Sequence, residues 1–354
     1  TYGKINNSLI VALLQTTTDE AAEFTGMIPI YHFLVSAAIL VFMVIFWRTH
    51  HRGHRNWLAL LLFVLCSVNS WPLQIVKGTV VGTTDTLREM QHYKQLSQHG
   101  ADNWKILPGT PLYDTIVIVT GESVSRDYMS VYGYPVPTTP WLNTAPGLFI
   151  DGYTSTAAST VPSLSRTLIY DYEQNPDSGN NVVALAAKAG YSTWWISNQG
   201  KLGEHDTRIS VIASDAEHTV FLKKGSFASR KTDDMQLLQE TERALADTSS
   251  PKVIFLHMMG SHPNPCDRLN SWPNNYQEQF PRKIACYLAS ISKLDNFLGQ
   301  LDGILRRHSR HFAMLYFSDH GLSVSDSTNP VHHDGHVQAG YSVPLIITAS
   351  DITS

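Results

Sequence analysis

The longest apolar runs of the chain lie near its N-terminus. No Asp, Glu, Lys or Arg occurs between Phe24 and Trp47, and none occurs between Asn56 and Val76. Each run is about as long as the hydrocarbon core of a bilayer requires. The pattern therefore predicts two transmembrane helices, over residues 28–47 and 57–76, in a partial membrane domain that spans residues 1–77. The alternative is a buried hairpin in a large globular core, although soluble helices of this length usually carry a polar face.

A short basic loop separates the two apolar runs and gives their orientation. It reads RTHHRGHR and contains Arg48, Arg52 and Arg55. Basic loops stay on the cytoplasmic side, so everything after residue 76 is expected outside. The chain opens without Met on that outer side and stops soon after a strand pattern, at ITASDITS. We therefore expect a portion of a longer protein that is incomplete at both ends.

Short apolar runs alternate with helical patterns in the rest of the chain. This alternation predicts an α/β fold with a mostly parallel sheet flanked by helices and with ligands at the carboxyl ends of the strands. Residues 78–108 are expected to be a linker, and residues 109–354 a water-soluble catalytic domain. The strand patterns cover residues 114–120, 191–197, 252–257, 312–318 and 342–348, and the helical patterns cover 162–170, 181–189, 233–246 and 279–307.

Charge and cysteine usage narrow the class of protein. The 354 residues include 26 basic and 30 acidic side chains, for a net charge of −4. The basic residues form no long run, which argues against a nucleic-acid partner. Cys66 lies in the second apolar run, whereas Cys266 and Cys286 bracket a polar loop of the outer domain. These two cysteines either form a disulfide, as exported proteins allow, or remain free thiols.

Ionisable side chains follow several of the predicted strands. Glu122 follows one strand, and Asp319 and His320 follow another. Two carboxylates and an imidazole are a natural ligand set for zinc, although each residue alone is more often a helix cap or an ion-pair partner. Histidines that can bind a metal or a phosphate oxygen also gather near strand ends: His257, His262, His332, His333 and His336.

A hydroxyl nucleophile is expected in the Thr- and Ser-rich run 153–168. Thr160 precedes Val161 and Pro162, and a proline in the first turn places Thr160 near a helix N-terminus. That position favours an anionic oxygen or a phosphate, and a metal ion could activate the hydroxyl. Thr160 could also be a simple N-cap. The rival nucleophiles are Thr154, Ser155, Thr156 and Ser159.

Other catalytic motifs do not fit. Ser125 occupies the place of the second glycine that a G-x-S-x-G elbow needs, and the chain has no Walker A, HExxH or dinucleotide motif. A sulfatase is disfavoured because the C/S-x-P-x-R context that matures to formylglycine is replaced by Thr160-Val-Pro-Ser-Leu.

Five motifs in order resemble a known family. They are VIVTGESVSRDYMSVYGYPVPTTPWL, the Thr-rich turn, WWISNQ, HMMGSH and YFSDHG. Together with the two apolar runs, they resemble the phosphoethanolamine transferases of Gram-negative bacteria, a branch of the alkaline phosphatase/sulfatase superfamily. The likeness is to the branch that modifies periplasmic glucans or the lipopolysaccharide core, because the turn lacks the Cys that follows Val-Pro in lipid A enzymes.

The resemblance implies a site and a reaction. Its zinc ligands would be Glu122, Thr160, Asp319 and His320, with Thr160 as nucleophile. Its substrate-binding residues would be His257, His262, Asn198, Gln199 and His332, with His336 as the alternative to His332. The implied donor is phosphatidylethanolamine, and the implied acceptor is a periplasmic glycan or lipopolysaccharide. The implied location is the bacterial inner membrane, which a multi-pass anchor would span, with the catalytic domain in the periplasm.

Two alternative functions are consistent with parts of this pattern. A phosphoglycerol transferase of the lipoteichoic acid synthase type would use the same superfamily site with phosphatidylglycerol as donor. A membrane-anchored binding module with an inert hydrolase-like domain would bind no zinc and turn over no lipid.

Overall fold

A computed structural model describes residues 30–49, 104–107, 109–172, 175–200, 208–223, 232–262, 264–325 and 330–353. The chain divides into two compact units, residues 1–89 and residues 90–354. In the first unit, α3 (Ile30–Thr49) is a 20-residue helix that overlaps the first predicted transmembrane helix. Among the described residues, no helix has both the length and the apolar character needed to span a bilayer. The second predicted transmembrane helix, at 57–76, lies outside the described residues.

The second unit is built on a seven-stranded sheet. Its strand order is β2-β11-β8-β1-β7-β5-β6, and the five strands from β8 to β6 are parallel. β11 runs antiparallel to both of its neighbours, β8 and β2. The mostly parallel sheet that the sequence predicts is therefore confirmed. The bounds of the strands are β1 Thr115–Gly121, β2 Leu148–Phe149, β5 Ser192–Gly200, β6 His218–Lys223, β7 Lys252–His257, β8 Phe312–Ser318 and β11 Leu345–Ala349.

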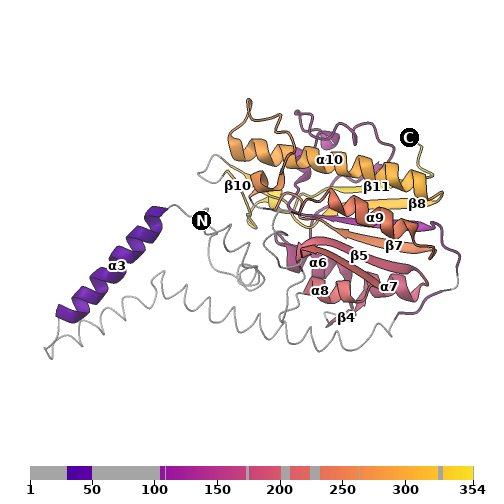
Figure 1. The fold of residues 1–354 in the computed structure, drawn as a ribbon, viewed down its shortest axis with the longest axis horizontal. Helices are drawn as coiled ribbons and strands as arrows, with labels where there is room; N and C mark the ends of the chain where they lie inside the picture. Colours follow the sequence, from indigo (N-terminus) through magenta and orange to yellow (C-terminus); the bar gives the residue numbers. More distant parts are fainter. Residues whose placement is uncertain are drawn as a thin grey trace. The chain divides into compact units, whose positions relative to one another are not determined.

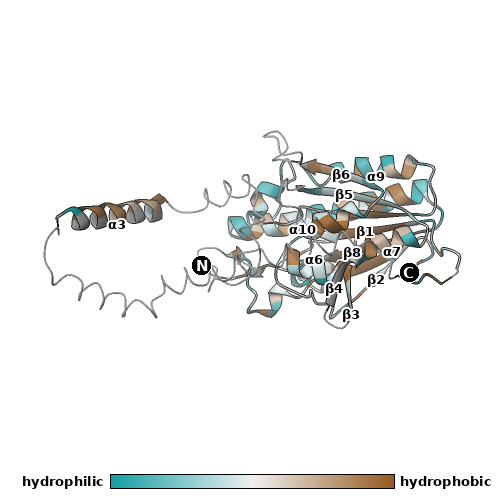
Figure 2. Ribbon diagram, turned by 90° about the horizontal axis from the view of Figure 1, so that it is seen from below, coloured by the Kyte–Doolittle hydropathy of each residue, from teal (hydrophilic) through white to brown (hydrophobic). Residues whose placement is uncertain are grey.

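Helices cover both faces of this sheet (Figure 1). On one face lie α9 (Gln236–Ala246) and α10 (Arg282–His308), and on the other lie α6 (Thr160–Leu168), α7 (Val182–Lys188) and α8 (Arg208–Ser214). The central strands are apolar on both sides, and in Figure 2 they are mostly brown, whereas α9 alternates brown and teal. Strands buried on both faces read as continuous apolar runs, which explains the IVIV of β1.

The alternation of side chains along β1 supplies two separate cores. Val117 and Val119 pack into the cluster that contains α9 and α10, whereas Ile116 and Ile118 face the cluster that contains α6 and α8. Because successive strand residues point to opposite faces, one short strand anchors both helical layers. The central position of β1 therefore fixes where its carboxyl end, and the residues after it, must lie.

The strands and helices predicted within residues 109–354 are found within three residues of their expected bounds. The last strand, β11, begins at Leu345 instead of residue 342 and runs antiparallel to β8. Pro344 precedes it and has no N–H to donate to a neighbouring strand. The sequence did not predict α8, β6, or the hairpin of β3 (Ile169–Tyr172) and β4 (Asn175–Asn181). These elements are short, so their periodicity carries little signal.

A disulfide joins Cys266 to Cys286. It connects the short 3-10 helix η4 (Pro265–Arg268) to the first turns of α10, across a sequence separation of 20 residues. The structure thus selects the disulfide over the free-thiol alternative. In the chain-entropy model, closing a loop of this length stabilises the folded state by about 3 kcal/mol.

Candidate active site

The strand register brings four carboxyl ends to one edge of the sheet. Gly121 at the end of β1 pairs with Ser318 at the end of β8. On the other side of β1, Thr120 pairs with His257 of β7, which in turn pairs with Ser197 of β5. The residues that follow these strands must therefore lie side by side. The predicted site residues of β1, β5, β7 and β8 all occupy this edge.

Glu122, Asp319 and His320 form a compact, buried group. Each offers one ligand atom, and these atoms lie within 4.8 Å of one another. His320 Nε2 is 3.3 Å from Glu122 Oε1 and 3.4 Å from Asp319 Oδ2. The three residues are at most 1% exposed, so bulk water does not screen their charges. The structure brings together the three ligands that the sequence proposed.

Ser123 holds the two carboxylates in place. Its N–H donates to Asp319 Oδ1 at 3.0 Å, and its hydroxyl donates to Glu122 Oε1 at 2.6 Å. Its φ of 62° lies in the left-handed region, which is rare for a residue other than glycine and concentrates at functional sites. The Tyr287 hydroxyl of α10 buttresses the same turn, because it accepts from Ser125 N at 2.9 Å and donates to Ser123 O at 3.0 Å.

Thr160 is the first residue of α6, and its side chain points at this group. Its hydroxyl donates to Glu122 Oε2 at 3.0 Å, and the same oxygen is 3.4 Å from His320 Nε2. The neighbouring hydroxyls bond elsewhere: Ser155 Oγ donates to Ala157 O, and Thr156 Oγ1 donates to Ser163 O. Among the candidate nucleophiles, all of which lie in the described residues, only Thr160 forms a hydrogen bond with the carboxylate and the imidazole. Its place at a helix start also suits an anionic oxygen.

The charges of Glu122, Asp319 and His320 influence one another strongly. Burial opposes ionisation of Glu122, but the hydrogen bond and charge of His320 prevail and hold its pKa well below the usual range. Burial and then the Glu122 charge raise the pKa of Asp319. Burial alone would lower the pKa of His320, yet the charge of Asp319 and the hydrogen bond to Glu122 raise it to about 9. Two carboxylates in this space thus favour a neighbouring cation, either a protonated imidazole or a metal ion.

Two observations show that the donor set fits zinc. His320 Nδ1 lies 3.1 Å from the Gly321 carbonyl, an outer-shell bond that fixes the ring and leaves Nε2 facing the carboxylates. Asp319 Oδ2 is buried and accepts no hydrogen bond from the described residues. Carboxylate oxygens and an imidazole nitrogen are ligands that zinc accepts, and Thr160 Oγ1 could complete a tetrahedral set.

The end of β7 and the turn that follows it carry two of the predicted histidines, His257 and His262. His257 is buried, with Nδ1 3.4 Å from Ser197 Oγ and with Nε2 unpartnered among the described residues. Burial lowers the pKa of His257 to about 4, against the attraction of Glu122, so its ring is neutral at physiological pH. The charge of His262 contributes to lowering the pKa of Glu122, which places this side chain near the same carboxylate.

The third predicted histidine, His332, lies in β10 (Val331–His332) beside His333, which the sequence placed among the histidines near strand ends but did not assign to the site. The ring of His333 is 4.6 Å from the ring of His320, and burial followed by the His320 charge lowers the pKa of His333 to about 3. His336, the alternative, is exposed, and its backbone N–H bonds Asp334. Among the described residues, no hydrogen bond or ion pair joins His332 or His336 to the Glu122 and Asp319 carboxylates. Adjacent residues at the end of a strand point to opposite sides, a signal that the sequence reasoning did not use.

Asn198 and Gln199 lie in the last residues of β5 at the same edge, and their side chains form hydrogen bonds within the protein. Asn198 Nδ2 donates to Asp234 Oδ1 at 2.8 Å, and Gln199 Nε2 donates to Met258 O at 2.9 Å. Asp234 also accepts from the backbone N–H groups of Met259 and Gly260, at 2.8 and 2.7 Å. The sequence prediction did not single out Asp234. This carboxylate joins the end of β5 to the turn after β7.

The same turn is pressed against the backbone of Glu122. Gly260 has φ +50°, and a Cβ at this position would lie 2.6 Å from Glu122 O and 2.9 Å from Glu122 N. Ser261 N donates to Glu122 O at 2.9 Å. Only glycine allows this approach. Asp234 therefore positions a turn that lies directly on a proposed metal ligand.

Comparisons with known proteins agree with this geometry. A family model described as Sulfatase matches residues 114–354. The phosphoethanolamine transferase OpgE of Escherichia coli is 32% identical over 379 residues, which cover 99% of this chain and 71% of OpgE. A Haemophilus influenzae protein provisionally named a phosphoethanolamine transferase is 36% identical over 339 residues, 91% of this chain and 70% of that protein.

Solved structures show the same fold. The integral membrane lipooligosaccharide phosphoethanolamine transferase A (EptA) of Neisseria meningitidis has a TM-score of 0.68 at 17% identity, over 99% of this chain and 73% of EptA. The C-terminal periplasmic domain of Escherichia coli EptC, in a complex with zinc, has a TM-score of 0.60 at 22% identity, over 68% of this chain and 74% of that domain. The family match and the two relatives decide the assignment: the chain belongs to the phosphoethanolamine transferases of the alkaline phosphatase/sulfatase superfamily and is a transferase enzyme.

Proposed function

We propose that this enzyme transfers phosphoethanolamine from phosphatidylethanolamine to a periplasmic glycan or lipopolysaccharide, through a phospho-threonine intermediate on Thr160. The observation that carries the proposal is the position of the Thr160 hydroxyl, 3.0 Å from Glu122 Oε2 and 3.4 Å from His320 Nε2 at the start of α6. A hydroxyl shared between a carboxylate and an imidazole is the arrangement expected of an activated nucleophile. The names of the two relatives support the transferred group.

The proposed metal is zinc, held by Glu122, Asp319, His320 and Thr160. The zinc complex of the EptC domain supports this choice, as does the unpartnered Asp319 Oδ2. When bound, zinc would lower the pKa of the hydroxyl and stabilise negative charge on the phosphate oxygens. Ser123 and Gly321 orient the ligands, since they bond the Glu122 and Asp319 carboxylates and the His320 ring.

The proposed reaction has two displacements at phosphorus. In the first, Thr160 Oγ1 loses its proton and bonds phosphorus, the bond from phosphorus to the diacylglycerol oxygen breaks, and that oxygen takes up a proton. In the second, an acceptor hydroxyl loses its proton and its oxygen bonds phosphorus, while the bond from phosphorus to Thr160 Oγ1 breaks and Oγ1 takes up a proton again. Burial lowers the pKa of His257 to about 4 and that of His333 to about 3, so both rings are weak bases suited to binding phosphate oxygens as neutral donors. His262 is the proposed general base.

The proposed location is the bacterial inner membrane, with residues 109–354 in the periplasm. The integral membrane character of EptA and the periplasmic domain of EptC support this location, as does the lipid nature of the donor. The Cys266–Cys286 disulfide is stable in an oxidising compartment such as the periplasm. The two spans at 28–47 and 57–76 and the linker at 78–108 are part of the same proposal.

The test is intact-mass measurement of the full chain after incubation with phosphatidylethanolamine and no acceptor. The protein should gain one phosphoethanolamine group. Thr160→Ala should abolish the gain, whereas Thr156→Ala should retain it, because the Thr156 hydroxyl bonds a backbone carbonyl instead. An adduct that persists in Thr160→Ala would refute the assignment of the nucleophile. An adduct of phosphoglycerol mass, formed only with phosphatidylglycerol, would favour a phosphoglycerol transferase of the lipoteichoic acid synthase type.

A further inference from the structure

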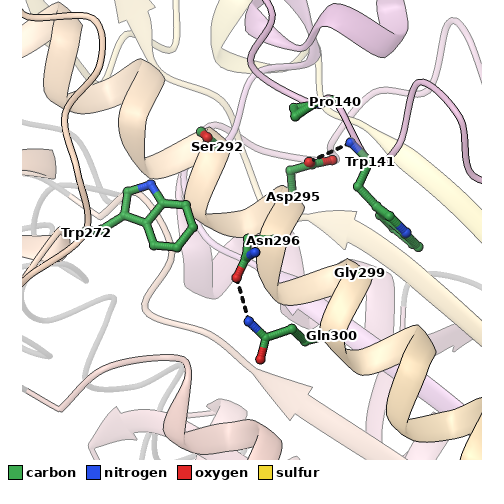
Figure 3. Close-up of a pocket in the computed structure, with 8 residues that line it drawn as sticks. All are labelled: Pro140, Trp141, Trp272, Ser292, Asp295, Asn296, Gly299 and Gln300. Atoms are coloured by element: carbon green, nitrogen blue, oxygen red, sulfur yellow. Dashed lines mark hydrogen bonds between the residues drawn. The ribbon is translucent and has the colours of Figure 1, made fainter.

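A cavity of about 350 Å³ lies on the outer surface of α10, away from the carboxyl edge of the sheet. Figure 3 shows the helix crossing the cavity, with Trp272 on one side and Trp141 on the other. The lining residues are Pro140, Trp141, Trp272, Ser292, Asp295, Asn296, Gly299 and Gln300. We call this cavity the tryptophan groove. None of these residues belongs to the proposed active site.

Both indole rings are half-buried and held in place. Trp141 packs directly on the helix, since a Cβ at Gly299 would lie 3.0 Å from the indole ring. The Asp295 carboxylate accepts the backbone N–H groups of Trp141 and Leu142, both at 2.9 Å. Trp272 packs on the cluster that includes Cys286, near the disulfide. The two rings are therefore rigid apolar surfaces that are partly open to solvent.

The floor between the rings is polar and uncharged at its surface. Asn296 and Gln300 lie one helical turn apart, and Gln300 Nε2 donates to Asn296 Oδ1 at 2.7 Å (Figure 3). That bond leaves the Asn296 N–H groups and the Gln300 carbonyl oxygen as further donors and an acceptor. Among the described residues that line the groove there is no lysine, arginine or histidine. The single charged residue, Asp295, is buried and bonded to backbone.

This combination selects one class of ligand. A sugar ring has an apolar C–H face that stacks on an indole and an edge of hydroxyls that pair with amides. Phosphorylated or otherwise anionic groups are disfavoured, because the groove has no cation and has a carboxylate beneath it. An acyl chain is disfavoured, because it would leave the two amides desolvated without partners. We propose that the tryptophan groove binds a neutral sugar chain of the glycan acceptor.

The groove is a separate subsite and cannot present the reacting hydroxyl. Tyr287 of α10 contacts the turn that carries Glu122, and Asn296 is nine residues further along the helix. Nine residues place the two side chains about 13 Å apart along the axis and on opposite sides of the helix. The groove would therefore tether a chain of several sugars while another unit reacts. The link to transfer rests on the proposed function, whereas sugar binding itself does not.

Sugar binding can be measured on the full-length Thr160→Ala protein, which holds an acceptor without modifying it. The probes are neutral α- and β-linked gluco-oligosaccharides of six units, with a sulfated dextran as the anionic comparison, and the readout is saturation-transfer NMR on the sugar C–H protons. Trp272→Ala and the exposed-residue variant Gln300→Ala should each weaken binding at least tenfold. Trp272→Phe should restore part of it, and Gln239→Ala, an equally exposed amide on α9, should leave it unchanged.

The outcomes separate the two proposals. Failure of all the neutral oligosaccharides to bind, equal binding by the groove variants, or a preference for the sulfated dextran would overturn the sugar subsite. In the active protein, Trp272→Ala should raise KM for a polymeric glycan acceptor at least fivefold and leave kcat and the KM of a monosaccharide acceptor unchanged. Oligosaccharide binding without any transfer of phosphoethanolamine would overturn the proposed function and leave the subsite standing.

Discussion

The two halves of the proposed active site lie at one edge of the sheet but differ in charge. The ligand half, formed by Glu122, Thr160, Asp319 and His320, gathers two carboxylates, an imidazole and a hydroxyl, and the carboxylates favour a neighbouring cation. The histidine half lies at the ends of β5 and β7. It contains the buried, neutral His257 and the side-chain amides of Asn198 and Gln199, which form hydrogen bonds within the protein. Each half contains buried side chains, yet only the first brings two carboxylates together.

Their supports differ in the same way. Short bonds from Ser123 hold the ligand half directly. The histidine half is held indirectly: Asp234 bonds the turn after β7, and Gly260 of that turn packs against Glu122. A substitution in the ligand half should therefore abolish nucleophilic attack or metal binding. A substitution in the histidine half should lower the reaction rate or the free energy of unfolding only partly.

The largest effect is expected from Asp319→Asn. The substitution keeps the shape but removes a charge from the proposed metal site, so zinc affinity should fall by more than about 100-fold and transfer activity with it. Zinc per chain can be measured by metal analysis of the purified protein, together with recovery of activity after chelation and zinc addition. The control is Asp302→Asn, which changes a buried carboxylate of α10 outside the proposed metal site and should leave zinc binding unchanged. Zinc binding that survives in Asp319→Asn, or a wild-type chain with neither zinc nor lipid turnover, would favour the inert binding module.

The next effect concerns His257 and pH. Because its pKa is about 4 in the folded protein and 6.5 in the unfolded chain, the unfolded chain binds the proton first as pH falls. The free energy of unfolding should therefore decrease from pH 6.5 towards pH 4, by about 2 kcal/mol at pH 5 from this residue. Denaturant unfolding of His257→Gln should show a correspondingly shallower loss between pH 7 and 5. A slope equal to that of the wild type would show that His257 is not held neutral.

A smaller effect is expected from Asp234→Asn. The side chain retains its size but loses its charge, which weakens its three hydrogen bonds to the end of β5 and the turn after β7. We expect kcat to fall by about tenfold, a loss of roughly 1.4 kcal/mol, with zinc content unchanged. The matched control is Asp233→Asn, which breaks the 2.7 Å bridge to Lys293 and should lower stability while kcat stays near wild type. Equal losses of kcat in the two variants would make Asp234 a general stabiliser only.

The sequence predicted the parts of the site that depend on strand ends. Glu122, Asp319 and His320 follow long apolar runs, and parallel strands place such residues together. The alternation also predicted the layers of the fold, although the antiparallel direction of β11 depends on pairing that periodicity cannot encode. His333 was named among the histidines near strand ends but was not assigned to the site, because its role depends on which side of a strand a residue faces. Asp234 was missed because its role depends on hydrogen bonds between distant segments. The left-handed turn at Ser123 has no compositional signal, since serine rarely adopts it.

The close approach of Gly260 to Glu122 limits how the specificity of this enzyme could be changed. Any other residue at position 260 would place a Cβ 2.6 Å from the Glu122 carbonyl oxygen, so the turn and the metal ligand would have to move together. A library that randomises this turn would consist largely of inactive variants, whatever acceptor is used for selection. Diversity introduced at the tryptophan groove, whose residues touch none of the proposed ligands, leaves the chemistry intact. Selection for a new acceptor should therefore begin on α10 and leave residue 260 as glycine.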